Sequence, residues 1–416
     1  MRQEKVKITY AGIFGAMVFI LLVSRILVLT SNYNWPIDPV SLQILYLFMT
    51  VAVVAAYNKG RIAVNKGNYL VVLGLLLIHT LLWGVVFVDG RMTSVITTQF
   101  RSQSMFVVVL CVTIWAVLQL QMQQNFLKCG YYALALVLFL QLIQNLSDVN
   151  LGNLANIFTA RERTRANFGF GHYNALGTAC VCVILMREYL KKQYRTPLKK
   201  ALDFLILIMA VVMLLCSASR SAITGLLLYY IVYYGSRMDH WHMSSAAIRT
   251  AKVFSIFAVV LLAVWALFGF DVSAFLVAAQ RSMLFTHTLP MFFKTDKVLL
   301  GLGYASNTAY AYGQTPYKTY WLDNAYIYYL VATGIVGVAL LMIAFFIIAR
   351  GLYKRRKTVE GASFFATFVV YAYISLFETA LFNSGGLVNY IYIPWFLLAI
   401  TGDGFHAKKE IKEKES

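Results

Sequence analysis

Charged residues are scarce in this sequence, and their scarcity excludes an ordinary soluble domain. Only 13% of the 416 residues are Asp, Glu, Lys or Arg, whereas 60% are hydrophobic. Soluble domains contain roughly 25% charged residues. The mean hydropathy of +0.69 points in the same direction. The composition therefore predicts a polytopic membrane protein.

Patterns typical of disulfide frameworks and metal sites are also missing. The five cysteines lie within or beside predicted helices, without the spacing of disulfides or zinc ligands, and we interpret them as small packing residues. The carboxylates expected on the outer face include no Asp-x-Asp pair, so a clamp for a hard cation is not visible. We therefore expect neither a metal nor a cofactor.

Long apolar runs recur along the whole chain. Most span about 15 to 24 residues, enough to cross roughly 30 Å of hydrocarbon as a helix. We predict an all-α protein with one transmembrane domain, residues 1–402, and a charged cytoplasmic tail, residues 403–416. The short seventh and eighth runs suit a tight hairpin around Ser219–Arg220. The twelve predicted helices are 8–30, 40–57, 69–88, 104–120, 131–147, 173–188, 201–218, 221–235, 253–269, 325–348, 362–382 and 388–402.

Lys and Arg residues are distributed unevenly between the two sides of the predicted membrane. If both termini are cytoplasmic, most of the 36 basic residues fall in cytoplasmic segments, as the positive-inside rule requires. The segment "MRQEKVKITY" leads into a run too long for a signal-peptide core, so we expect the first helix to remain. The net charge of +19 then reflects topology and attraction to anionic lipids, and nucleic acid need not be a partner.

Several arginines on the outer side oppose this orientation rule. A planar guanidinium pairs well with phosphate or carboxylate and stays charged at physiological pH, so these residues could converge on one anionic group. Alternatively, Arg161 and Arg163 pair with Glu162 or with lipid phosphates, and Arg220, in "SASRSA", belongs to an ordinary polar hairpin. The outer arginines considered are Arg161, Arg163, Arg165, Arg220 and Arg281.

Other polar residues lie at the predicted helix entries. His172, in "GFGHYN", is either a structural hydrogen-bonding residue or a general base, and Asn174 caps or braces the start of its helix. Asp323 and Asn324 enter the tenth helix, where Asp323 is either a helix cap or a carboxylate that accepts a proton from an alcohol. Glu378 is the only acidic residue well inside a predicted helix, so we expect it to face a polar cavity or a partner.

One outer loop, residues 270–324, is much longer than the others. Its first part suits an amphipathic helix near the interface, "GLGYASN" supplies glycines for a close turn, and "YAYGQTPYKTYW" is rich in aromatic residues. These aromatic residues and Tyr304 either line a glycan path or anchor the loop at the interface.

The order of these motifs resembles one known family. "RANFGFGHYNALG", "SASRSA", "RSMLF", "VLLGLGYASN" and "DNAYIYYLVATGIVG", within residues 155–345, resemble the O-antigen ligase and Wzy-type polysaccharide polymerase family. The resemblance implies a membrane glycosyltransferase of GT-C type that uses undecaprenyl-diphosphate-linked sugars outside the cytoplasmic membrane, without a metal. Arg165, Arg220 and Arg281 correspond to the family's arginines. Family ligases have a histidine near the helix entry where this chain has Asp323, which favours a polymerase.

The expected function is therefore polymerisation of undecaprenyl-diphosphate-linked repeat units for a capsule, exopolysaccharide or O-antigen-like glycan in the bacterial cytoplasmic membrane. The three arginines would neutralise the diphosphate, and Asp323, or else His172, would accept the proton of the incoming hydroxyl. Membrane lipids, a flippase and a chain-length regulator are the expected partners. The alternatives are ligation of a finished glycan to another acceptor and flipping or transport of a lipid-linked sugar. Further candidates for substrate contact are Arg161, Arg163, Asn174, Tyr304 and Asn324.

Overall fold

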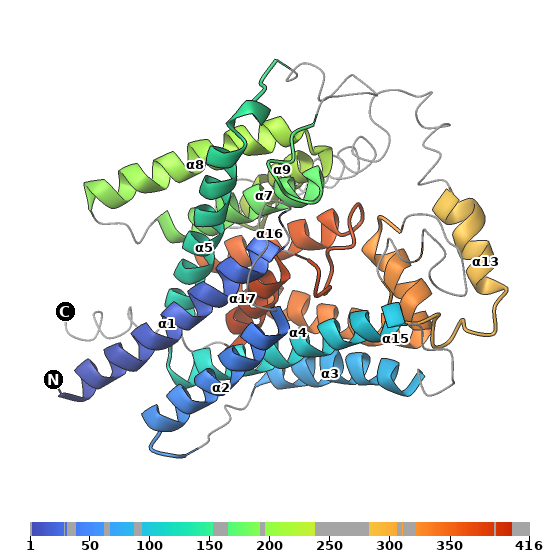
Figure 1. Ribbon diagram of the computed structural model, residues 1–416, viewed down its shortest axis with the longest axis horizontal. Coiled ribbons are helices and arrows are strands. Elements are labelled where there is room, and N and C mark those ends of the chain that lie inside the picture. The colour runs from blue at the N-terminus through green and yellow to red at the C-terminus, as the bar shows by residue number, and fades with distance from the viewer. Residues whose placement is uncertain are drawn as a thin grey trace, which may run out of the picture.

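The computed structural model is helical throughout the part of the chain that it describes (Figure 1). Among these residues the strand-like pairing is limited to one isolated bridge between Thr30 and Phe170. The described residues are 2–28, 30, 39–61, 67–86, 94–152, 165–191, 196–237, 283–305, 310, 322–386 and 388–401.

Each observed longer helix overlaps one predicted apolar run, although α4 and α5 begin about ten and eight residues earlier than predicted. The predicted run over 253–269 lies outside the described residues. The longer helices are α1 (Arg2–Val28), α2 (Pro39–Tyr57), α3 (Asn68–Val86), α4 (Ser94–Gln119), α5 (Gln123–Gln144), α7 (Tyr173–Leu190), α8 (Pro197–Ser217), α9 (Arg220–Arg237), α15 (Ala325–Arg355), α16 (Val359–Ile374) and α17 (Asn389–Thr401). Short elements are η2 (Leu146–Asp148), η5 (Leu284–Thr288) and α13 (Leu289–Phe293).

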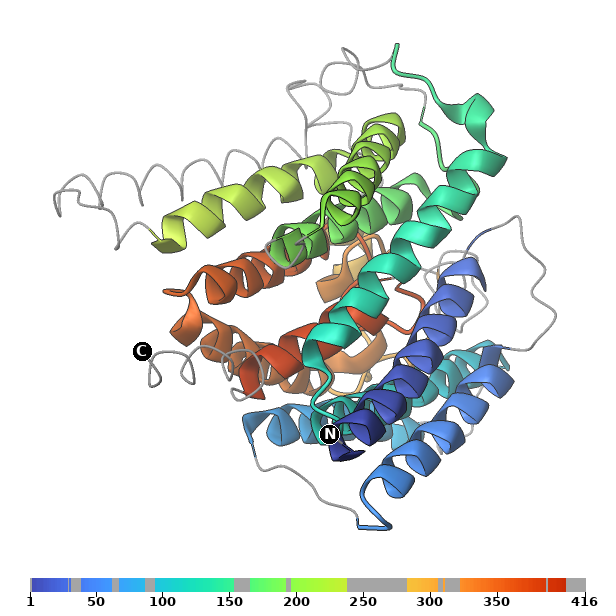
Figure 2. The same ribbon diagram turned by 90° about the vertical axis from the view of Figure 1, so that its left-hand side faces the viewer.

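Within these residues, 6 helices contain segments long and apolar enough to cross a membrane: α1, α2, α4, α5, α8 and α15. Three further apolar helical segments, in α3, α16 and α17, are shorter. The architecture is thus that of a helical, polytopic membrane protein, while the number of twelve spans stays a prediction. Figure 2 shows α5 crossing beside α1, in agreement with the packing of Gly15 against Cys129.

The two ends of the bundle are distinguished by the helix termini that meet there. Near the end of α1, Arg25 Nη2 donates to Ser384 O, just before α17, at 3.3 Å. At the end of α15, Arg355 Nη2 donates to Ile400 O, near the end of α17, at 3.2 Å. The start of α1 therefore lies at the same end of the bundle as the last turns of α15 and α17, while α13 lies at the opposite side in Figure 1. The end of the bundle that holds the start of α1 is the one predicted to be cytoplasmic.

The eleventh predicted span, 362–382, is too long. Helix α16 ends at Ile374, and the rest of the run forms turns whose residues are mostly buried or half-buried. Side chains satisfy the backbone there: Tyr371 Oη accepts from Phe382 N–H at 2.8 Å, and Gln103 Nε2 donates to Phe382 O at 2.9 Å. A run of apolar residues can form either a helix or turns whose backbone groups bond to neighbouring side chains. Hydrophobicity alone does not tell these two structures apart. Glu378 consequently lies in a turn beyond α16, and the prediction that it lies inside a helix is wrong.

The glycines of "GLG" pack against a break in α15. Gly334, with φ of 66°, interrupts that helix, and Gly301 has φ of 82°. Leu302 N–H donates to Val331 O at 2.8 Å, and Ile335 N–H donates to Val298 O at 3.0 Å. A Cβ on Gly301 would lie 2.3 Å from Ala332 O, so only glycine permits this approach. The loop thus supplies hydrogen-bond partners that the broken helix lacks.

Candidate functional site

Four helix ends meet at the end of the bundle opposite the start of α1. Asn174, in the first turn of α7, donates from Nδ2 to Glu378 Oε1, just beyond α16. Ala325 N–H, at the start of α15, donates to Ser375 O at 2.9 Å. Gly177 of α7 lies directly against Ser219, which precedes α9. The polar residues carried by these ends are called here the polar corner: Arg165, His172, Asn174, Arg220, Asp323, Asn324 and Glu378.

Arg165 is held by the segment that leads into α7. Its guanidinium carbon lies 4.1 Å from the centre of the Tyr173 ring, a cation–π geometry. The next residue, Ala166, donates its N–H to Cys216 O, near the end of α8, at 3.1 Å. The segment that carries Arg165 therefore runs beside the α8–α9 turn. Cys216 lies only four positions before Arg220, the first residue of α9. The sequence-predicted pair Arg165 and Arg220 is thus carried by neighbouring backbone segments.

His172 is the N-cap of α7. Its Nδ1 accepts a hydrogen bond from Asn174 N–H at 3.2 Å. A neutral imidazole whose Nδ1 accepts carries its proton on Nε2. In this arrangement His172 can donate a hydrogen bond from Nε2–H. To act as a general base, its Nδ1 would have to give up the hydrogen bond from Asn174 N–H that caps the helix.

The electrostatics of His172 link it to two other residues of the polar corner. Its side chain is exposed on one side, and partial burial on the other lowers its pKa. The negative charge of Asp323 raises this pKa, and the positive charge of Arg165 lowers it further. The charge of Asp323 therefore acts on the ring from the start of α15, and that of Arg165 from the segment that leads into α7. Because burial dominates, the imidazole is mainly neutral at pH 7.

Asn324, and not Asp323, caps α15. Asn324 Oδ1 accepts from the N–H groups of Tyr326 and Ile327, each at 3.0 Å, and its Nδ2 donates to Leu376 O at 3.0 Å. The interpretation of Asp323 as the cap is therefore wrong, because the next residue satisfies the helix start. Asp323 itself is half-buried immediately before the cap.

The polar corner favours an anion through its backbone as well as through its arginines. Helices α7, α9 and α15 all begin there, and each helix N-terminus carries partial positive charge from its aligned peptide dipoles. Two arginines, three helix starts and the carboxylates of Asp323 and Glu378 thus share one region. Sequence reasoning missed Glu378 as a site residue. Its isolated charge in an apolar run was the available signal, but the helix boundary was misplaced.

Other sequence candidates do not join the polar corner in the described structure. Tyr304 is buried, at 1% exposure, and its hydroxyl lies 3.1 Å from the Tyr329 hydroxyl on α15. Its observed role is packing in an aromatic cluster. Arg161, Arg163 and Arg281 lie outside the described residues. Within the described residues, no three His, Cys, Asp or Glu side chains are grouped as metal ligands would be.

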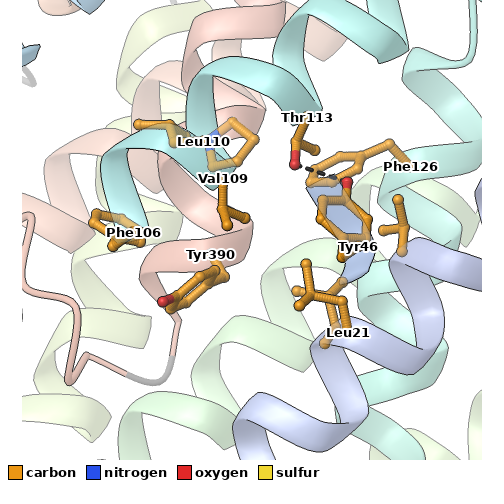
Figure 3. Close-up of a pocket in the computed structure, with 11 residues that line it drawn as sticks. Leu21, Tyr46, Phe106, Val109, Leu110, Thr113, Phe126 and Tyr390 are labelled. Carbon is orange, nitrogen blue, oxygen red and sulfur yellow. Dashed lines mark hydrogen bonds between the residues drawn. The ribbon is translucent and has the colours of Figure 1, made fainter. Parts of the chain in front are cut away.

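A void also lies within the bundle, between α1, α2, α4, α5 and α17 (Figure 3). It is lined by apolar residues such as Leu21, Phe106 and Phe126, while the hydroxyls of Tyr46 and Thr113 bond to each other at 2.8 Å. Its volume of about 10 Å³ holds at most one water molecule. It is therefore a packing defect and no binding site.

The sequence was compared with known proteins. No protein-family model matches it, and no curated protein matches it. The features of this protein that bear on its function are accordingly the helical membrane architecture and the polar corner.

Proposed function

We propose that this protein is a membrane glycosyltransferase that polymerises undecaprenyl-diphosphate-linked oligosaccharide units at the outer face of a bacterial cytoplasmic membrane. The observation that carries the proposal is the meeting of separate helix starts that carry Arg165, His172 and Asp323. Hydrogen bonds from Ala166 to Cys216, from Asn174 to Glu378 and from Ala325 to Ser375 hold these helix ends together. Such a combination of cation, imidazole and carboxylate at an anion-favouring corner suits displacement of a diphosphate by an alcohol. The motif order in residues 155–345 supports the same reaction.

In the proposed reaction, the hydroxyl of one glycan attacks the anomeric carbon of another that is linked to undecaprenyl diphosphate. A glycosidic bond forms, the bond from the anomeric carbon to the diphosphate oxygen breaks, and undecaprenyl diphosphate leaves as an anion. Arg165, Arg220 and the helix starts stabilise that developing charge, with Arg281 as a further predicted contributor. Asp323 accepts the proton of the attacking hydroxyl.

His172 and Asn174 have supporting roles in this scheme. His172 Nε2–H donates a hydrogen bond to a diphosphate or sugar oxygen, because its Nδ1 is engaged in the helix cap. Glu378 accepts from the Asn174 amide and so orients it toward the substrate side of α7. In the membrane, a flippase would supply the lipid-linked units and a chain-length regulator would act on the growing polymer.

The test uses purified protein in liposomes with lipid-linked oligosaccharide units and measures product length by gel electrophoresis. Asp323→Asn is expected to slow elongation by about 100-fold or more, because a positioned base is lost. Arg220→Ala is expected to slow it by about 100-fold, because an anion-stabilising charge is lost. The matched control is Asp296→Asn. Asp296 lies in the turn after α13 and its side chain is 75% exposed. Its Oδ2 is 3.8 Å from Lys297 Nζ, an exposed pair that contributes little.

The outcomes separate the alternatives. Elongation without an ion gradient supports a polymerase, whereas transfer of an unchanged glycan to a new anchor identifies a ligase. Movement of the lipid-linked unit across the bilayer, without any new glycosidic bond, identifies a transporter. An Asp323→Asn protein that elongates as fast as the Asp296→Asn control would remove Asp323 from the mechanism.

A further inference from the structure

A second site lies at the end of the bundle predicted to be cytoplasmic, far from the polar corner along α15. A cavity of about 450 Å³ opens between α3, α15 and α17. Its walls come from the start of α3, the last turns of α15 and the end of α17. The described lining residues are Asn68, Val71, Phe346, Ile347, Arg350, Gly351, Lys354, Arg355 and Ile400.

The charges that the described residues bring to this cavity all have one sign. Arg350, Lys354 and Arg355 line it, and no acidic residue is among the described residues of its lining. Arg350 and Lys354 are exposed and lie four positions apart on α15, so their side chains share one face of the helix. Arg355 bonds to the carbonyl oxygens of Ala399 and Ile400 at the end of α17. These bonds hold the third guanidinium in the wall and tie α17 to α15.

The start of α3 adds a second contribution to anion binding. Asn68 is the first residue of this 19-residue helix, whose first turn contains no acidic residue. Asn68 lines the cavity, so the start of α3 lies at the cavity wall. The N-terminal N–H groups of α3 carry partial positive charge there, which favours an anion. The cavity therefore combines three cationic side chains with a helix N-terminus.

The cavity also has an apolar edge. Phe346 is 65% exposed and Val71 is 55% exposed, and both line the cavity. Phe346 lies about one helical turn, roughly 6 Å, from Arg350 along α15, toward the middle of the apolar helix. In a bilayer, exposed apolar side chains at this depth face acyl chains, while the basic residues beyond them reach the headgroups.

We propose that this cavity binds one anionic phospholipid. Its phosphate lies between Arg350, Lys354 and the start of α3, and its acyl chains run along Phe346 and Val71. The apolar edge favours a lipid over a soluble phosphate, because a soluble anion would leave that edge exposed. Basic recesses between membrane helices near the cytoplasmic surface suit such headgroups. This site is independent of the glycosyltransferase proposed above.

The experiment titrates the purified protein in detergent with phosphatidylglycerol and counts bound lipids by native mass spectrometry. Phosphatidylcholine with the same acyl chains tests the charge, and glycerol 3-phosphate tests the need for acyl chains. The test variant is Arg350→Gln/Lys354→Gln. The matched control is Lys199→Gln/Lys200→Gln, which removes two exposed charges from α8 at the same predicted membrane face.

The first phosphatidylglycerol is expected to bind at least about tenfold more tightly than phosphatidylcholine, and glycerol 3-phosphate is expected to bind more weakly than either lipid. The test variant should lose about 25-fold in affinity for phosphatidylglycerol, about fivefold for each charge removed, whereas the control should stay near the wild type. Should the double variant fail to fold, Lys354→Gln alone should lose about fivefold. Equal losses in test and control variants would overturn the site, and glycerol 3-phosphate binding as tight as that of phosphatidylglycerol would overturn its lipid occupant.

Discussion

Replacement of Gly177 by alanine tests the contact that brings α7 to the α8–α9 turn. A Cβ at Gly177 would lie 2.7 Å from Ser219 Cβ and 2.9 Å from Ala222 Cβ. Both neighbours are Cβ atoms fixed to the backbone, so rotation of a side chain cannot relieve the overlap. The helices would have to separate by roughly 1 Å, which typically costs about 1–3 kcal/mol in a packed interior.

The matched control is Gly74→Ala in α3, where an added Cβ meets nothing within 4 Å. Alanine is the better helix former by about 1 kcal/mol, so this control should be as stable as the wild type or more stable. We expect Gly177→Ala to be less stable than this control by about 1–3 kcal/mol, because both variants gain the same helix propensity and only Gly177→Ala meets the overlap. Denaturant or thermal unfolding in detergent, followed by circular dichroism, measures the difference.

A rescue variant makes the test specific. Ser219→Gly removes the closer of the two overlapping atoms, so Gly177→Ala/Ser219→Gly should recover part of the loss beyond the sum of the single changes. Gly177→Ala should also slow elongation, because separation of α7 from the α8–α9 turn moves His172 and Asn174 relative to Arg220. The reasoning is refuted if Gly177→Ala is as stable as Gly74→Ala.

Three further predictions concern α15 and the polar corner. Gly334→Ala places a Cβ 2.3 Å from Leu299 O at positive φ, so we expect about 3 kcal/mol or more of destabilisation, measured by unfolding. Burial lowers the folded-state pKa of His172, so its contribution to stability is full above about pH 6.5 and is lost as the pH falls. His172→Asn should flatten unfolding stability between pH 7 and pH 5; an unchanged pH profile would contradict this. Glu378→Ala removes the acceptor of the Asn174 amide and should slow elongation by about tenfold or more, whereas Glu378→Gln, which still accepts, should be slowed less.

Much of the helical architecture could be predicted from composition and hydropathy. The predicted starts at residues 69, 173 and 325 lie within one residue of the observed starts of α3, α7 and α15. These helices are long apolar runs with polar residues at their starts, which local sequence specifies well. The end of α16 was misplaced, because side chains satisfy the turns beyond Ile374: Tyr371 of the same helix, and Gln103, which is 279 positions from Phe382.

The candidate site was predicted less completely. Arg165, His172, Arg220 and Asp323 were selected from motifs, but the role of Asp323 as a cap was wrong because Asn324 occupies that position. Glu378 was predicted to lie inside a helix, because the run around it is apolar, whereas it lies in a turn beyond α16. Its contact with Asn174 joins residues 204 positions apart, a separation over which sequence periodicity carries no information.

By itself, the sequence determined that this chain is a helical membrane protein, because hydrophobicity and charge act locally and need no tertiary contact to be recognised. It also determined that cationic and polar residues stand at helix entries. Only the tertiary structure decided which helix ends meet, that Asn324 rather than Asp323 caps α15, and that the "GLG" loop packs into the break at Gly334. These features depend on the close approach of segments far apart in the chain, where steric fit and hydrogen-bond saturation select one arrangement.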